Sequence, residues 1–126
     1  MRQVVILGAT GSIGCSTLSV LALHPEKFQV LALTAATQTS KLLAQCLAVK
    51  PRYAAMLCPN AAAELNTTLK EQGSTTIVLA GAEALCELAA HPDADIVMAA
   101  IVGAAGLLPT LAAVEQGKTV LLANKE

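Results

Sequence analysis

Short apolar runs rich in β-branched residues alternate with longer runs rich in alanine and leucine along this chain of 126 residues. The short runs cover residues 3–8, 28–34, 53–58, 75–81, 94–102 and 118–124, and the longer runs, in which apolar residues recur at helical spacing, cover 11–25, 39–51, 60–73, 82–92 and 106–117. Strands that alternate with helices form parallel sheets, and continuously apolar strands are buried on both faces. The pattern predicts an α/β fold, a doubly wound and mostly parallel sheet of about six strands with helices on both faces.

The connections of such a Rossmann-like sheet are expected to be right-handed. The expected strand order is 3-2-1-4-5-6, with the ligand crevice at the carboxyl ends of the first and fourth strands. Thr39 or Ser40 is expected to cap the second helix and Asn60 the third. Gly73 and Gly117 are expected to stop the third and fifth helices.

Composition limits the possible functions. A formal net charge of −1 and an aromatic content of 2% provide neither a basic face nor a stacking surface, so we expect no nucleic-acid partner. No apolar run reaches the roughly 18 residues of a membrane helix, so we expect no membrane partner. Free thiols and the absence of a signal peptide favour a cytoplasmic protein. The four cysteines lie outside C-x-x-C pairs and are interpreted as small buried residues: Cys15, Cys46, Cys58 and Cys86.

The stretch "GATGSIG" (residues 8–14) follows the first strand and opens the first helix. At this position Gly8 allows a tight turn, Gly11 lets the backbone approach a pyrophosphate, and Gly14 lets the helix pack closely on the strand. Thr10 and Ser12 add hydroxyl donors. Unpaired amides and the helix dipole favour an anion, so we interpret the loop as nucleotide-binding and not as a plain turn.

The segment after the second strand, "LTAATQTS" (33–40), indicates which dinucleotide is bound. An acidic residue that binds the ribose 2′-hydroxyl of NAD usually stands here, and this segment has none, which permits NADP. The hydroxyls and amides that follow offer neutral donors, and Lys41 offers a positive charge. Alternatively, Thr39 or Ser40 only caps the next helix.

Two stretches, "VVILGATGSIGCSTLSVL" and "MAAIVGAAGLLPTLAAVEQGKTVLLANKE" (98–126), closely resemble the 1-deoxy-D-xylulose 5-phosphate reductoisomerase family, with "LLANKE" the most specific phrase. The resemblance extends over the whole chain and implies an NADPH-binding domain over residues 1–126. It also implies that the chain is truncated and that the catalytic, metal-binding and C-terminal domains lie outside it. The residues it implies for cofactor binding are Gly8, Thr10, Gly11, Ser12, Ile13, Ala36, Thr37, Gln38, Asn124 and Glu126, and for substrate binding Lys125.

The sequence departs from the family pattern after the second strand. Ala36, Thr37 and Gln38 stand where family members typically have Gly-Lys-Asn or a near variant. The lysine expected to contact the 2′-phosphate is therefore missing. The Thr37 hydroxyl and the Gln38 amide can still bind this phosphate, but each contact is weaker than a charge-assisted bond.

For the full-length enzyme, the resemblance implies conversion of 1-deoxy-D-xylulose 5-phosphate to 2-C-methyl-D-erythritol 4-phosphate by metal-dependent rearrangement and hydride transfer from NADPH. It implies a phosphosugar substrate, a Mg or Mn ion, a lid and a homodimer. We expect no catalytic residue and no metal ligand in this segment. Asp93 and Asp95 are expected to be structural, and the helical acids to be exposed: Glu64, Glu71, Glu83 and Glu87.

Two other functions fit the loop. A semialdehyde dehydrogenase-like reductase carries a similar glycine loop but requires a catalytic cysteine in a second domain. A nucleotide-sensing domain without catalysis is the other alternative. Whether the reading frame continues past Glu126 separates the sensing domain from the enzymes.

Overall fold

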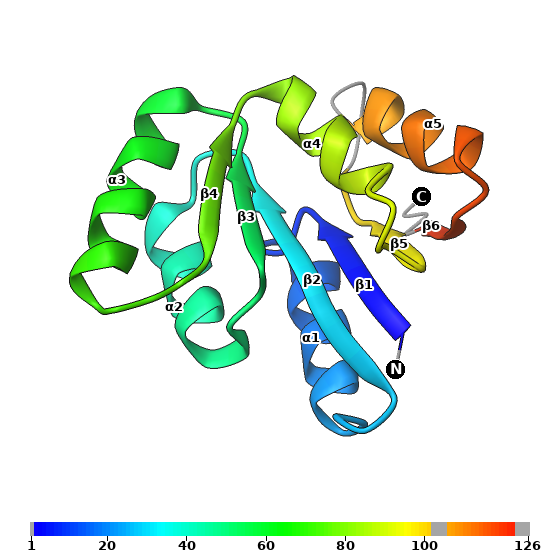
Figure 1. Cartoon of the computed structure of the whole chain (residues 1–126), viewed down its shortest axis with the longest axis horizontal. Helices are drawn as coiled ribbons and strands as arrows, with labels where there is room; N and C mark the ends of the chain where they lie inside the picture. The colour runs from blue at the N-terminus through cyan, green and yellow to red at the C-terminus, as the bar shows by residue number, and fades with distance from the viewer. Residues whose placement is uncertain (1, 102–105, 123–126) are drawn as a thin grey trace.

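The computed structural model describes residues 2–101 and 106–122 of the chain. Within these ranges six strands alternate with five helices, as the sequence pattern predicted (Figure 1). The strands are β1 (Arg2–Leu7), β2 (Phe28–Ala35), β3 (Tyr53–Met56), β4 (Ile77–Ala80), β5 (Ile96–Ala99) and β6 (Thr119–Leu122). The helices are α1 (Ser12–Ala22), α2 (Thr39–Val49), α3 (Pro59–Glu71), α4 (Ala82–Ala89) and α5 (Leu107–Glu115).

All strand pairs are parallel, and the order is β4-β3-β2-β1-β5-β6. The expected order is wrong for the fourth strand, which continues outward beyond β3 and does not return beside β1. The burial of the two strands agrees with this order. Ile77 and Ala80 of β4 are exposed, as suits an edge strand, whereas Ile96, Val97 and Ala99 of β5 are buried beside β1.

Side chains alternate between two apolar layers, one on each face of the sheet. Val4 and Ile6 of β1 point into a layer covered by α1, α2 and α3. Val5 and Leu7 point into the other layer, which contains residues of α4 and α5. Since these four β1 side chains are at most 2% exposed, β1 is buried on both faces and lies at the centre of the fold.

The ends of the helices differ in part from the expectation. Gln38, not Thr39 or Ser40, is the cap residue before α2, which starts at Thr39. Cys58, not Asn60, is the cap residue before α3, which starts at Pro59. Proline suits the first helical position because the N–H that it lacks has no intrahelical acceptor there. The expected stops are confirmed, since Gly73 and Gly117 follow helix ends with φ of +76° and +73°.

The cysteines are free, but their expected burial is only partly confirmed. Cys46 is buried, Cys58 and Cys86 are half-buried, and Cys15 is exposed on the first turn of α1. None of the helices in 2–101 and 106–122 has the length and apolar character that crossing a membrane requires.

Candidate nucleotide-binding site

The loop that joins β1 to α1 requires glycine at two of its three glycine positions. Gly8 has φ +82°, and a Cβ there would lie 3.0 Å from the carbonyl oxygen of Ala100, so a tight turn beside β5 excludes a side chain. A Cβ at Gly14 would lie 2.6 Å from Cα of Ala9, which confirms the close packing of helix on loop. Contacts within the chain therefore account for glycine at both positions, without any ligand.

Gly11 has no such structural reason. Its φ is −76°, which any residue adopts, and a Cβ there would meet only the Gly8 carbonyl oxygen, at 3.7 Å. The residue is exposed, and the space in front of it is open. The absence of a side chain at this position therefore leaves room for an external group and satisfies no internal constraint.

Backbone donors face this open space. Ser12 and Ile13 begin α1, where the N–H groups have no intrahelical acceptor, and no acceptor for either lies among the described residues. In the part of the chain that the structure describes, no side chain caps the helix, and its first turn contains no acidic residue. The positive end of the α1 dipole is thus available to an anion.

A cavity of about 180 Å³ adjoins the loop at the carboxyl ends of β1, β2 and β5. The expected crevice between the first and fourth strands is therefore corrected to one between β1 and β5, because β4 lies at the far edge of the sheet. The lining residues come from the last residue of β2, from four connections and from α4: Gly8, Thr10, Gly11, Ala35, Ala36, Leu57, Leu85, Ala100 and Ile101.

Three of the proposed cofactor residues follow β2. Ala36 lines the cavity, whereas Thr37 and Gln38 are exposed beside it at the start of α2. The Thr39 N–H donates to the Thr37 carbonyl oxygen at 2.8 Å, which turns the chain into the helix. Asn124, Lys125 and Glu126 lie outside the described residues.

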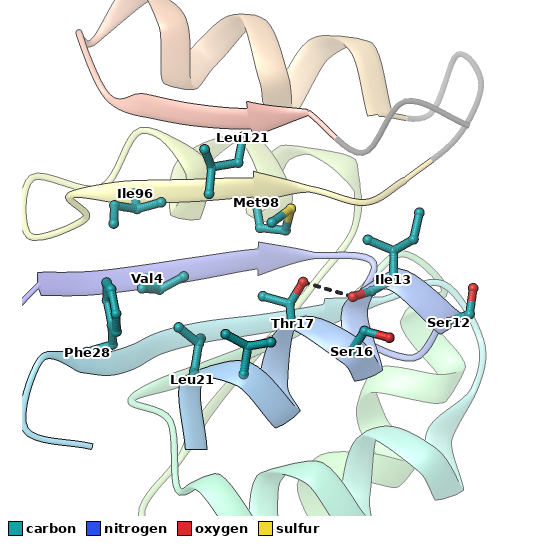
Figure 2. Close-up of a pocket in the computed structure, with 11 residues that line it drawn as sticks. Val4, Ser12, Ile13, Ser16, Thr17, Leu21, Phe28, Ile96, Met98 and Leu121 are labelled. Carbon is teal, nitrogen blue, oxygen red and sulfur yellow. Dashed lines mark hydrogen bonds between the residues drawn. The ribbon is translucent and has the colours of Figure 1, made fainter. Parts of the chain in front are cut away.

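Ser12 and Ile13 also line a second and larger cavity, of about 470 Å³, between α1 and the β5–β6 half of the sheet (Figure 2). Its lining is apolar except for three hydroxyls, and that of Thr17 donates to the Ile13 carbonyl oxygen at 2.8 Å. None of the described residues that line it carries a charge. An apolar hollow of this kind suits apolar side chains and not a phosphate, so the smaller crevice at the loop is the better candidate site. The larger cavity is lined by Val4, Ser12, Ile13, Ser16, Thr17, Val20, Leu21, Phe28, Ile96, Met98 and Leu121.

Sequence reasoning missed two polar residues that hold the loop. Thr34 of β2 is fully buried, and its Oγ1 accepts a hydrogen bond from the Gly8 N–H at 3.1 Å. Gln45 of α2 donates from Nε2 to the Ala9 carbonyl oxygen at 2.8 Å. A polar residue inside the apolar run of β2 was a visible signal for Thr34, but no sequence signal connects Gln45 with a loop 36 residues away.

Among the described residues, no charged side chain lines the crevice. Arg52 and Asp93 form an ion pair with an N–O distance of 2.8 Å near the amino ends of the strands, and the hydrogen bond from Arg52 lowers the pKa of Asp93. The Asp95 carboxylate accepts the Gln3 N–H at 2.8 Å. Both aspartates are structural, as expected, and the helical acids are exposed. In 2–101 and 106–122 no three metal-ligating side chains form a group.

A parallel doubly wound sheet with a glycine loop between its first strand and first helix defines a Rossmann-like α/β domain. Comparison with known families is more specific, because the sequence profile of the 1-deoxy-D-xylulose 5-phosphate reductoisomerases matches residues 4–126. The chain belongs to this family, and membership excludes the semialdehyde dehydrogenase-like alternative.

Two curated relatives, both named 1-deoxy-D-xylulose 5-phosphate reductoisomerase, support this membership. The protein of Aeromonas hydrophila is 61% identical and that of Haemophilus ducreyi 59% identical, each over 100% of this chain and 32% of the relative. The chain thus spans about a third of the length of these relatives.

Solved structures are similar over the same segment. A crystal structure of DOX-P reductoisomerase in complex with NADPH, fosmidomycin and magnesium superposes with a TM-score of 0.94, at 44% identity over 98% of this chain and 30% of that one. The Zymomonas mobilis reductoisomerase in complex with NADPH gives a TM-score of 0.90, also at 44% identity, over 98% of this chain and 32% of that one.

Proposed function

We propose that residues 1–126 act as the NADPH-binding domain of a 1-deoxy-D-xylulose 5-phosphate reductoisomerase. The observation that carries the proposal is Gly11, whose missing side chain leaves open space beside the first N–H groups of α1, which have no acceptor in 2–101 and 106–122. The crevice between β1 and β5 is where doubly wound sheets bind dinucleotides. Two of the similar solved structures are complexes with NADPH.

The residues around the loop fit the cofactor. The N–H groups of Thr10, Ser12 and Ile13 would hold the pyrophosphate, because they and the helix dipole complement negative charge. The Gly11 N–H donates to the Gly8 carbonyl oxygen at 3.3 Å, so Gly11 would line the pyrophosphate through its open space. Gly8 would leave the turn after β1 without a side chain, so that the cofactor can lie beside it. When bound, NADPH supplies hydride, and the role of this chain is to place the cofactor at the carboxyl edge of the sheet.

The segment after β2 would select the phosphorylated cofactor. No carboxylate stands between residues 33 and 41, so nothing repels a 2′-phosphate. Thr37 and Gln38 are exposed at the start of α2 and would donate to it, with Ala36 leaving space beside them. Lys41 is exposed one turn further and supplies the positive charge closest in the sequence.

The rest of the reaction is proposed for the longer protein. It would convert 1-deoxy-D-xylulose 5-phosphate to 2-C-methyl-D-erythritol 4-phosphate in the cytoplasm, as a homodimer. Asn124 and Glu126 would lie at the nicotinamide and Lys125 at the phosphosugar. The described residues form no group that fits Mg or Mn, so the ligands of this metal would come from the remaining two thirds of the protein.

Calorimetric titration of the chain with NADPH and with NADH tests the proposal. We expect tighter binding of NADPH, because the segment after β2 lacks an acid, and equal affinity or a preference for NADH would contradict this. Gly11→Val is expected to abolish binding while the circular dichroism spectrum stays unchanged, because the branched side chain fills the open space. Ala63→Val, on the exposed surface of α3, is the control and is expected to bind normally.

A further inference from the structure

Gln45 connects helix α2 to the glycine loop. Its Nε2 donates to the Ala9 carbonyl oxygen at 2.8 Å and lies 3.6 Å from Sγ of Cys15. Its Oε1 is buried and has no partner among the described residues. The amide group of Gln45 is therefore oriented by the Ala9 carbonyl oxygen and, more weakly, by Cys15 in the first turn of α1.

The peptide that follows Ala9 is fixed by this contact. The Ala9 N–H already donates to the Thr34 carbonyl oxygen at 2.8 Å, so β2 holds one side of Ala9 and α2 holds the other. A trans peptide is planar, with its C=O and N–H pointing in opposite directions. Since the Ala9 carbonyl points at Gln45, the Thr10 N–H in the same peptide points away from α2.

The direction away from α2 leads toward the crevice. Thr10 lines the cavity together with Leu85, which belongs to the apolar layer on the opposite face of the sheet from α2. The Thr10 N–H has no acceptor among the described residues, so an N–H that points to this side adds a donor to those at the start of α1. Rotation of the Ala9–Thr10 peptide would remove that donor from the crevice.

We propose that Gln45 is a positioning residue, which aims the Thr10 N–H at the pyrophosphate of the bound dinucleotide. The inference rests on the proposed function, because it requires a pyrophosphate at the loop. Gln45 lies in the helix whose first turn follows the proposed 2′-phosphate residues, so α2 would serve both phosphate sites of the cofactor. The two sites are separable, since Gln45 contacts the pyrophosphate loop and lies almost two turns from Gln38.

The test compares the binding of two ligands to the wild-type chain and to two variants of Gln45. NADPH has both the pyrophosphate and the 2′-phosphate, whereas adenosine 2′-monophosphate has only the latter. Gln45→Met keeps the length of the side chain but removes the donor, and Gln45→Glu keeps its shape but places an acceptor against the Ala9 carbonyl. We expect the Kd for NADPH to rise about fivefold to tenfold with Met, and further with Glu, while the Kd for adenosine 2′-monophosphate changes less than about twofold.

Gln72→Met is the matched control, because Gln72 follows α3 at the opposite end of the strands and is exposed. We expect it to leave both dissociation constants unchanged. Equal weakening of both ligands by the Gln45 variants would show a general structural effect and overturn the inference, as would unchanged NADPH affinity. A wild-type chain that binds adenosine 2′-monophosphate but not NADPH would overturn the proposed function, and the inference with it.

Discussion

Replacing Gly14 by alanine places a methyl group among backbone atoms. The added Cβ would lie 2.6 Å from Cα and 2.7 Å from the carbonyl carbon of Ala9, well below the 3.0 Å that such contacts respect. Both neighbours are backbone atoms of a loop held by Thr34 and Gln45, so no flexible side chain can move aside. Helix α1 and the loop must therefore separate by several tenths of an ångström.

The expected loss of stability follows from two opposing effects. Overpacking of a close contact costs about 1–3 kcal/mol, and alanine regains up to about 1 kcal/mol because it favours the helix over glycine. A net loss of about 1–2 kcal/mol results. With an unfolding entropy of about 2.1 cal/mol/K per residue, a chain of 126 residues loses about 4 °C of Tm per kcal/mol. Gly14→Ala is thus expected to lower Tm by about 4–8 °C.

Thermal unfolding followed by far-UV circular dichroism measures the effect. Gly11→Ser is the control, because Gly11 has an ordinary φ and open space around its Cα, and serine is a favoured residue before a helix. Its Tm is expected to stay within about 2 °C of the wild-type value. An unchanged Tm for Gly14→Ala, or an equal loss for Gly11→Ser, would refute the packing argument.

Two further predictions concern titrating groups. Burial raises the pKa of Cys46 to about 12, so only about one molecule in ten thousand carries its thiolate at pH 8, and iodoacetamide followed by peptide mass spectrometry is expected to label exposed Cys15 long before Cys46. Faster labelling of Cys46 would contradict the buried position. The hydrogen bond from Arg52 lowers the pKa of Asp93, so its contribution to stability is present above the unfolded-chain value of about 3.9 and is lost as the pH falls through the lower folded value. Asp93→Asn is expected to lose less stability than wild type on acidification from pH 6 to about 3, as measured by the midpoint of urea unfolding at each pH. Midpoints that fall by the same amount in the two chains would disprove this prediction.

The sequence alone was sufficient to predict the strands and helices and the position of the glycine loop between the first strand and the first helix. Hydrophobic periodicity depends on which faces are buried, and the apolar strand runs left no alternative to a sheet covered on both sides. Gly8 and Gly14 were predicted correctly, because a tight turn and a close helix contact have strong local requirements. The proposed role of Gly11 remains a prediction, since it depends on a ligand.

Neither the strand order nor the two residues that hold the glycine loop, Thr34 and Gln45, could be predicted from local sequence patterns. Alternation of strands and helices does not say on which side of β1 a later strand pairs, and only the exposure of Ile77 against the burial of Val97 distinguishes an edge position from a central one. The contact between Gln45 and Ala9 arises only after α2 has packed beside the loop. The helix caps at Gln38 and Cys58 also escaped prediction, because neither residue type is a favoured cap.

The central position of β1 has a consequence for the order of folding. Its contact with β2 joins residues 26 apart, as in the Gly8–Thr34 bond, whereas its contact with β5 joins residues 92 apart, as in the Gln3–Asp95 bond. Closing the longer loop costs about 1 kcal/mol more chain entropy. We therefore expect β1 to pair with β2 first and with β5 later. The crevice between β1 and β5 is then expected to form in a late step, and the proposed binding of a nucleotide there would slow the reopening of the sheet.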